Sequence, residues 1–325
     1  MPKLNHIQYA KAESILIENN YSLSALVENT SFDELTQEYK KKLHFTKLKT
    51  FSFSKEGFLG LLLELKTNIA ISLGESQAII AAGKLFETLG FEITWLDLNI
   101  DGKVKLSALE NKTIDFLFLS SYVMDTFVIT NLQKIKEKTK AKIISNASAN
   151  LDKNSDIIYF DPYKLTGYNT NTVLLFNDET FSLLPIGEID AIACKLCLNA
   201  IDKQHFNTKP KAIFLEKLKA TFKDDIYFFV EPDTTLEYTL HFALKGIKAR
   251  ELIRTLALSE IYLTNGEGCS LGLSKPSRII QAMGYDEMTS RNSLSLSFVD
   301  EISQEEIEKV IKLMYLKYKQ IKSFS

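Results

Sequence analysis

The chain has 325 residues, of which 45% are hydrophobic and 25% charged, with a mean hydropathy of −0.05. This composition is that of a folded globular protein and excludes a disordered or collagen-like chain. The formal net charge is −2, from 39 Lys and Arg against 41 Asp and Glu, so charge gives no basis for nucleic acid or an anionic membrane as the main partner.

The chain also lacks the marks of a membrane or secreted protein. Its longest apolar run, residues 58–63, is far shorter than the roughly 20 residues of a membrane-spanning helix. The first residues carry no apolar core of signal-peptide length, and three cysteines do not make a disulfide framework. We therefore expect a cytoplasmic protein, and its length suggests about two domains.

Helices and strands alternate through the first two thirds of the chain. Residues 7–43 have a polar, helical pattern, which predicts an N-terminal helical arm over 1–45. The predicted strands then cover 68–73, 92–96, 114–120, 142–145, 157–160 and 173–176, and the helices between and after them cover 76–89, 130–138 and 189–201. This alternation predicts a large α/β domain over 46–205, with a mostly parallel sheet covered by helices on both faces.

The pattern changes after residue 206. Predicted helices cover 212–222, 248–257, 277–283 and 303–318, and predicted strands cover 226–231, 238–243, 261–264 and 293–298. Helices and antiparallel strands in this order predict a small C-terminal α+β domain over 206–325. Since no Gly/Ser-rich or Pro-rich linker separates the two parts, we expect them to be packed together.

A lone cysteine stands out in the small domain. Cys269 lies in a stretch with Gly266, Gly268 and Gly272, just before a helix that follows Pro276. Glycines allow backbone conformations that bring a thiol close to a ligand, so Cys269 is a candidate nucleophile. A single cysteine in a glycine-containing loop is, however, more often an ordinary thiol than a nucleophile.

Three segments together resemble a known family, the cysteine desulfurase branch of the class V aminotransferases. NGEGCS followed by PSRIIQAMG is similar to the family's loop T/S-x-G-S-A-C-[ST]-x-G and its helix start P-S-x-V-L-x-A-[LM]-G. GFEITWLDLNIDGKVKLSALE and NSDIIYFDPYKLTGYNTNTVLLF resemble two runs of the family's large domain. The similarity extends over about residues 68 to 320.

The resemblance implies a fold-type I transferase that uses pyridoxal 5'-phosphate. The large domain would hold a seven-stranded mixed sheet, and two copies would form a homodimer. Lys164 occupies the position of the Schiff-base lysine, and Cys269 that of the thiol that takes sulfur from substrate cysteine as a persulfide. A sulfur-acceptor protein would then be a partner.

The same resemblance places further residues around the cofactor. Asn146 replaces the Asp that pairs with the pyridine nitrogen, Ala147 lies under the ring, and Ser76 replaces a stacking histidine. Tyr163 precedes the lysine, where the family has a histidine. Because an amide cannot hold the pyridine nitrogen protonated as a carboxylate does, the electron sink would be weaker.

The residues at the positions that bind the cofactor phosphate and the substrate carboxylate also differ from the family pattern. The phosphate cup S-G-A-T-E-S-N is matched by SKEGFLG, which contains Ser54 and Gly57 and adds the negative charge of Glu56. A carboxylate near a helix N-terminus disfavours a bound phosphate. Ser295 stands where the family has the arginine that binds the substrate carboxylate.

Two functional hypotheses therefore stand side by side. Lys164 and Cys269 favour an active cysteine desulfurase-like enzyme, whereas the replaced contacts favour a degenerate, inactive relative that acts as a binding or scaffold subunit. Cys194 and Cys197 form a C-x-x-C inside an apolar helical pattern, which predicts core packing, and no metal site is expected.

Overall fold

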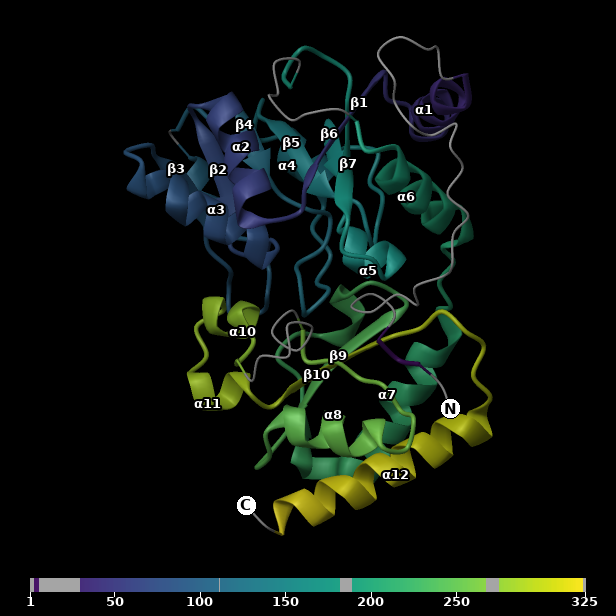
Figure 1. Cartoon of the computed structure of the whole chain (residues 1–325). Helices are drawn as coiled ribbons and strands as arrows, with labels where there is room; N and C mark the ends of the chain where they lie inside the picture. The colour runs from purple at the N-terminus through teal and green to yellow at the C-terminus, as the bar shows by residue number, and fades with distance from the viewer. Residues whose placement is uncertain (1–2, 6–29, 111, 182–188, 267–274, 324–325) are drawn as a thin grey trace.

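The structure is a computed structural model, and it describes residues 3–5, 30–110, 112–181, 189–266 and 275–323. Figure 1 shows two lobes, one built around a large sheet and the other around a small sheet and the long C-terminal helix. The predicted arm 1–45 is described only in part, because residues 6–29 lie outside these ranges. The predicted domain boundaries stay predictions.

The large lobe contains a seven-stranded sheet in the order β1-β7-β6-β5-β4-β2-β3, counted over the described residues. Only β7 runs against the others, so the sheet is mixed and mostly parallel, as the sequence predicts. The strands are β1 (Lys47–Ser52), β2 (Ile69–Ser72), β3 (Ile93–Leu96), β4 (Phe116–Phe118), β5 (Lys142–Asn146), β6 (Ile157–Tyr159) and β7 (Asn171–Phe176).

Helices cover both faces of this sheet, which explains why its central strands are apolar without alternation. On one face lie α2 (Lys55–Leu65) and α3 (Gln77–Thr88), and on the other α1 (Thr30–Leu43), α4 (Leu132–Lys136) and α6 (Ala191–Lys203). Ile157 packs toward α2 and α3, whereas Ile158 packs toward α6. Cys194 and Cys197 are fully buried in α6, which confirms the predicted core packing.

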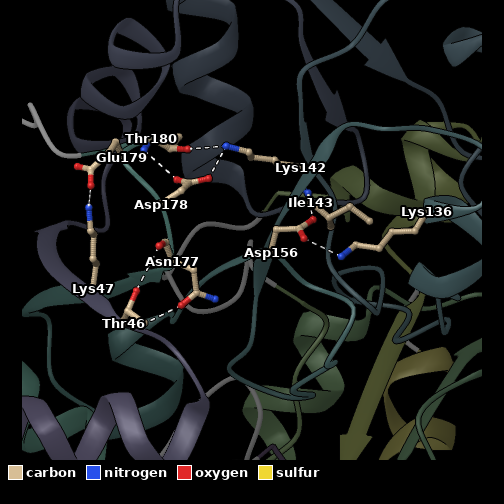
Figure 2. A network of polar contacts seen from close by, with 10 residues as sticks. All are labelled: Thr46, Lys47, Lys136, Lys142, Ile143, Asp156, Asn177, Asp178, Glu179 and Thr180. Atoms are coloured by element: carbon tan, nitrogen blue, oxygen red, sulfur yellow. Dashed lines mark hydrogen bonds and ion pairs between the residues drawn. The ribbon is translucent and has the colours of Figure 1, made fainter.

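Polar contacts join the strands at one edge of the large sheet (Figure 2). Lys142, the first residue of β5, forms an ion pair with Asp178, just after β7. Asp156, just before β6, accepts from Lys136 Nζ at 2.7 Å and from the Ile143 amide at 2.8 Å. Because β5 and β6 begin here, these contacts connect the strands at the edge where the parallel strands start. The opposite edge, where these strands end, is the carboxyl edge, at which such sheets bind ligands.

The small lobe has a three-stranded antiparallel sheet in the order β10-β9-β8 within the described ranges. Its strands are β8 (Ile226–Tyr227), β9 (Thr239–Leu244) and β10 (Ser293–Ser297). Its helices are α7 (Lys209–Phe222), α8 (Ala249–Ala257), α10 (Arg278–Ala282), α11 (Glu287–Ser290) and α12 (Gln304–Lys322). A capping box, in which Ser303 and Glu306 bond to each other's backbone N–H groups, starts α12.

The structure differs from the predicted elements at several places. Residues 261–264 form only isolated bridges, from Tyr262 to Lys3 and from Thr264 to Ser295, and the strand predicted at 226–231 ends at Tyr227. A short helix that the sequence analysis did not predict, α5 (Pro162–Thr166), follows β6. Single 3-10 turns occupy Ser107–Leu109, Lys223–Asp225 and Pro232–Thr234.

An apolar cluster fills the space between the two lobes. Large-lobe residues around Tyr122 and Phe127 pack against small-lobe residues of β9 and α10. The ring of Tyr238 stacks on Phe206 at 3.7 Å between centroids, and its hydroxyl donates to the Ala149 carbonyl. This packing fixes the small lobe over the carboxyl edge of the large sheet.

Buried His241 in β9 makes the stability of the fold sensitive to acid. Burial lowers the pKa of His241 from 6.5 to about 4. The unfolded chain therefore binds a proton at His241 below pH 6.5, whereas the native state binds it only below about pH 4. The free energy of unfolding consequently falls by roughly 3 kcal/mol as the pH is lowered through this window. We expect His241→Gln to remove most of this pH dependence in denaturant unfolding measured at pH 7.5 and pH 4.5.

The exposed histidine His205 provides the matched control, because His205→Gln leaves the buried ring unchanged. An identical loss of stability in wild type and His241→Gln between the two pH values would contradict this account of His241.

Candidate cofactor site at the carboxyl edge of the large sheet

Most of the predicted cofactor residues meet at one edge of the large sheet. Strands β2, β4, β5 and β6 are parallel, so the residues that follow them lie at the same edge. Ser76 follows β2, Asn146 ends β5, Ala147 comes next, and Lys164 follows β6. Crevices outside the carboxyl ends of parallel strands are where such sheets bind ligands.

Lys164 is held on the short helix α5. Asp161 caps this helix by accepting from the Lys164 amide at 3.1 Å, and Gly167 ends it with a φ of 78°. The Lys164 side chain is only 6% exposed. Its Nζ lies 3.4 Å from Asp161 Oδ2 and 3.9 Å from Met124 Sδ, so a buried amine with a carboxylate partner stands at the centre of the site.

Asn146 presents its amide in one defined orientation. Its Oδ1 accepts from the Ser148 amide at 3.0 Å and from Ser148 Oγ at 2.6 Å. Its Nδ2 is buried and has no hydrogen-bond partner among the described residues. Ser148 Oγ also accepts from the Asp161 amide at 2.6 Å, so the Asn146 side chain and the Lys164 helix are joined through one hydroxyl.

A buried carboxylate, Glu75, organises the neighbouring part of the edge. It accepts from the Ser120 amide and, at 3.1 Å, from the Tyr159 hydroxyl. Burial, and then the Glu75 carboxylate, hold the pKa of Tyr159 well above its ordinary value, so the phenol stays a donor. Ser120 Oγ in turn accepts from the Asn146 amide at 3.0 Å, which links Glu75 to the Asn146 strand.

Ser76 lies beside Glu75 as the N-cap residue of α3. Its side chain makes no capping hydrogen bond, and its Oγ is buried with no partner within the described ranges. Buried hydroxyls almost always find a partner, because an unmade bond costs about 1–3 kcal/mol. Ser76 Oγ and Asn146 Nδ2 are therefore two polar atoms at the same edge that fit a bound polar group.

At the start of α2, where the resemblance places the cofactor phosphate, the polar groups already bond within the protein. Ser52, the last residue of β1, pairs with Asn171, so the start of α2 lies at the carboxyl edge. Ser54 caps α2 by accepting from the Gly57 amide at 3.2 Å. A side chain at Gly57 would lie 1.9 Å from the Ser52 carbonyl oxygen, so only glycine fits there.

The remaining predicted residues have varied surroundings. Ala147 is buried in the cluster beneath β6, and Tyr163 is 39% exposed on α5. Glu56 pairs with Lys55 at 3.3 Å, which offsets part of its charge at the start of α2. Cys269 lies outside the described residues, but its flanks Gly266 and Ser277 are described.

Pyridoxal phosphate fits this edge at its ring end. Lys164 offers a buried amine, and Asn146 Nδ2 and Ser76 Oγ offer hydrogen bonds that no described residue uses. The phosphate end is less well provided, since the Ser54 hydroxyl already caps its own helix. The described residues contain no group of three His, Cys, Asp or Glu side chains that suits a metal ion.

Sequence reasoning missed several residues that shape this edge. Glu75 and Ser148 orient the neighbouring groups, and Arg278 of α10 donates to the Leu73 carbonyl at 2.6 Å and to the Glu75 carbonyl. One available signal was the acidic residue at position 75, shortly after the apolar strand β2, because a carboxylate that is buried requires partners.

Comparison with known proteins supports the family resemblance. No family model matches the chain. Cysteine desulfurase IscS of Colwellia psychrerythraea is 22% identical over 282 residues, which are 74% of this chain and 67% of that protein. Cysteine desulfurase IscS of Rickettsia bellii is 20% identical over 296 residues, or 80% of this chain and 71% of the relative.

Solved structures agree on the fold. A NifS-like protein superposes with a TM-score of 0.76 at 14% identity, over 98% of this chain and 99% of that one. The Escherichia coli cysteine desulfurase CsdA gives a TM-score of 0.71 at 13% identity, over 98% and 95% of the two chains. The fold is therefore the predicted fold-type I α/β fold. In sequence the chain is similar to cysteine desulfurases at 22% identity or less, and it shares its fold with NifS-like proteins.

Proposed function

We propose that this protein is a pyridoxal phosphate-dependent, cysteine desulfurase-like enzyme, with Lys164 as the attachment residue and Cys269 as the sulfur carrier. The observation that carries the proposal is the buried Lys164 amine, at the edge where Ser76 Oγ and Asn146 Nδ2 have no partner among the described residues. The relatives named cysteine desulfurase supply the reaction class.

The residues around Lys164 have separable roles in this proposal. The cofactor, when bound, supplies an electron sink, which allows bonds at the carbon atoms of the amino acid substrate to break. Asp161 Oδ2, 3.4 Å from Lys164 Nζ, orients the amine and is placed to take its proton. Asn146 Nδ2 donates to the ring end, and its orientation is fixed by Ser148.

Cys269 performs the sulfur step. Its thiolate attacks the sulfur of the bound substrate cysteine and forms an S–S bond. The substrate C–S bond breaks, its electron pair stays with the β-carbon, and a proton is added there, so alanine leaves and a persulfide remains on Cys269. A sulfur-acceptor protein then takes the terminal sulfur. In this proposal the protein works in the cytoplasm as a homodimer.

A second candidate function rests on the residues at the positions expected to bind the cofactor phosphate and the substrate carboxylate. Ser54 already caps α2, Glu56 is acidic, and Ser295 Oγ donates to the Asp125 carbonyl at 2.9 Å. A site so arranged binds the phosphate and the substrate carboxylate weakly. The corresponding proposal is a degenerate relative that serves as a binding or scaffold subunit, and the first experiment below separates the two.

Cofactor attachment is tested by the absorbance spectrum of the purified protein with added pyridoxal phosphate. We expect a visible or near-ultraviolet band from the lysine-bound cofactor that persists after gel filtration and is absent in Lys164→Ala. The exposed Lys153→Ala serves as the matched control and should keep the band. No band at saturating cofactor, or an unchanged band in Lys164→Ala, rejects the enzyme proposal in favour of the scaffold.

Sulfur transfer is tested by alanine release from cysteine. Because Cys269 is the proposed nucleophile, Cys269→Ser should lower the rate by at least about a hundredfold while leaving the cofactor band intact. Cys197→Ser, a change of a buried core thiol, should retain the rate. Equal rates in wild type and Cys269→Ser would remove Cys269 from the reaction.

A further inference from the structure

The turn 123–127 between β4 and α4 is strained. Asp125 and Phe127 adopt positive φ values of 62° and 60°, although neither is glycine. The left-handed region costs an L-residue roughly 1–2 kcal/mol, least for Asp and Asn and more for a bulky side chain. Such strain persists only where the surroundings hold it, and it is typical of functional sites.

The Asp125 carboxylate is buried against the chain on the C-terminal side of residues 267–274. Asp125 is 2% exposed, and its Oδ2 accepts from Ser277 Oγ at 2.9 Å. The same Ser277 hydroxyl caps α10, because it accepts from the Ile280 amide at 3.3 Å. One hydroxyl thus joins the start of α10 to the large lobe.

The carboxylate also faces the chain on the N-terminal side of that segment. Gly266 has a φ of 106°, and a side chain there would lie 2.2 Å from Asp125 Cγ. The Gly266 amide donates to Thr264 Oγ1 at 3.1 Å, which fixes the glycine relative to the small-lobe sheet. Gly266 and Ser277 therefore approach the same carboxylate from the two ends of residues 267–274.

The turn also contacts two other predicted functional residues, one through its backbone and one through a side chain. The Asp125 carbonyl accepts from Ser295 Oγ at 2.9 Å, and Met124 Sδ lies 3.9 Å from Lys164 Nζ. A single strained turn thereby contacts the lysine, the serine at the expected carboxylate-binding position and both flanks of the Cys269 segment.

We propose that Asp125 is a positioning residue that anchors both flanks of the segment carrying Cys269 to the large lobe. A buried carboxylate suits this role, because the cost of its burial is offset only while its hydrogen bonds are made. Arg278, next to Ser277, adds a second attachment to the large lobe through the Leu73 and Glu75 carbonyls. The catalytic meaning of this anchoring rests on the proposed role of Cys269, but the anchoring itself does not.

The anchoring is tested with a nitroxide label on Cys269 of the full chain, without added cofactor. The chain has three cysteines, and Cys194 and Cys197 are buried with thiol pKa values that burial raises, so Cys269 is labelled selectively. Peptide mapping by mass spectrometry verifies the labelled position. Electron paramagnetic resonance then reports the rotational correlation time of the label.

We expect Asp125→Ala and Ser277→Ala each to shorten this correlation time by about twofold or more, because one flank or both become loose. Asp125→Asn should restore most of the wild-type value, since Asn tolerates a positive φ and keeps an oxygen for Ser277. Asp286→Ala is the matched control for a lost helix cap, because Asp286 caps α11 through Thr289 and should leave the spectrum unchanged. The double variant Asp125→Ala/Ser277→Ala should add little to either single change.

Several results would overturn the proposal. A wild-type label already at the free-rotation limit shows that the flanks are not held, and variant spectra that superimpose on the wild type show that Asp125 does not hold them. Faster motion together with labelling of Cys194 and Cys197 indicates general loosening of the fold instead. Failure of the cofactor experiment would leave these spectra unaffected, so the two proposals are tested independently.

Discussion

The site depends on a chain of buried hydrogen bonds along the carboxyl edge of the large sheet. Glu75 accepts from the Ser120 amide, Ser120 Oγ accepts from the Asn146 amide, and Ser148 joins the Asn146 side chain to the Asp161 amide. Each member is strongly coupled to the next, because buried polar groups carry a large penalty when a partner is lost. Lys164 is therefore positioned by residues from strands that are distant in sequence. Substitution of any single residue in this network would be costly, because its partner would lose a hydrogen bond.

The site combines groups that favour a ligand with groups that are already satisfied within the protein. At the ring end, Ser76 and Asn146 carry polar atoms without partners in the described chain, as a binding site should. At the positions expected for the phosphate and the substrate carboxylate, the hydroxyls of Ser54 and Ser295 form hydrogen bonds within the protein. If the proposed function holds, the protein would keep the groups that face the cofactor ring and have a weaker hold on both the phosphate and the substrate carboxylate.

The sequence predicted the large sheet well, because apolar strands and helical periodicity depend on local pattern. The roles of the site residues came from the family resemblance and stay predictions. Ser76, Asn146, Ala147 and Lys164 each follow a predicted strand, and parallel strands bring their ends together. The hydrogen-bond directions were beyond reach, since the orientation of Asn146 depends on Ser148, and Asp125 acts on residues about 140 and 150 positions away. The strand predicted at 261–264 failed because its pairing is limited to single bridges.

The first residues of the described chain change how the two lobes can be separated. Leu4 is fully buried in the small-lobe core, where its amide donates to the Tyr262 carbonyl at 3.0 Å and its carbonyl accepts from the Ser297 amide at 2.8 Å. Helix α1, only a few tens of residues later, packs instead on α6 of the large lobe. The small lobe thus contains residues from two pieces of chain that are far apart in sequence, residues 3–5 and the part after residue 206. A fragment cut near residue 206 would lack a buried leucine of its own core, a loss of the kind that costs about 2–5 kcal/mol. In evolutionary and engineering terms, this lobe is a discontinuous folding unit and not an interchangeable C-terminal module.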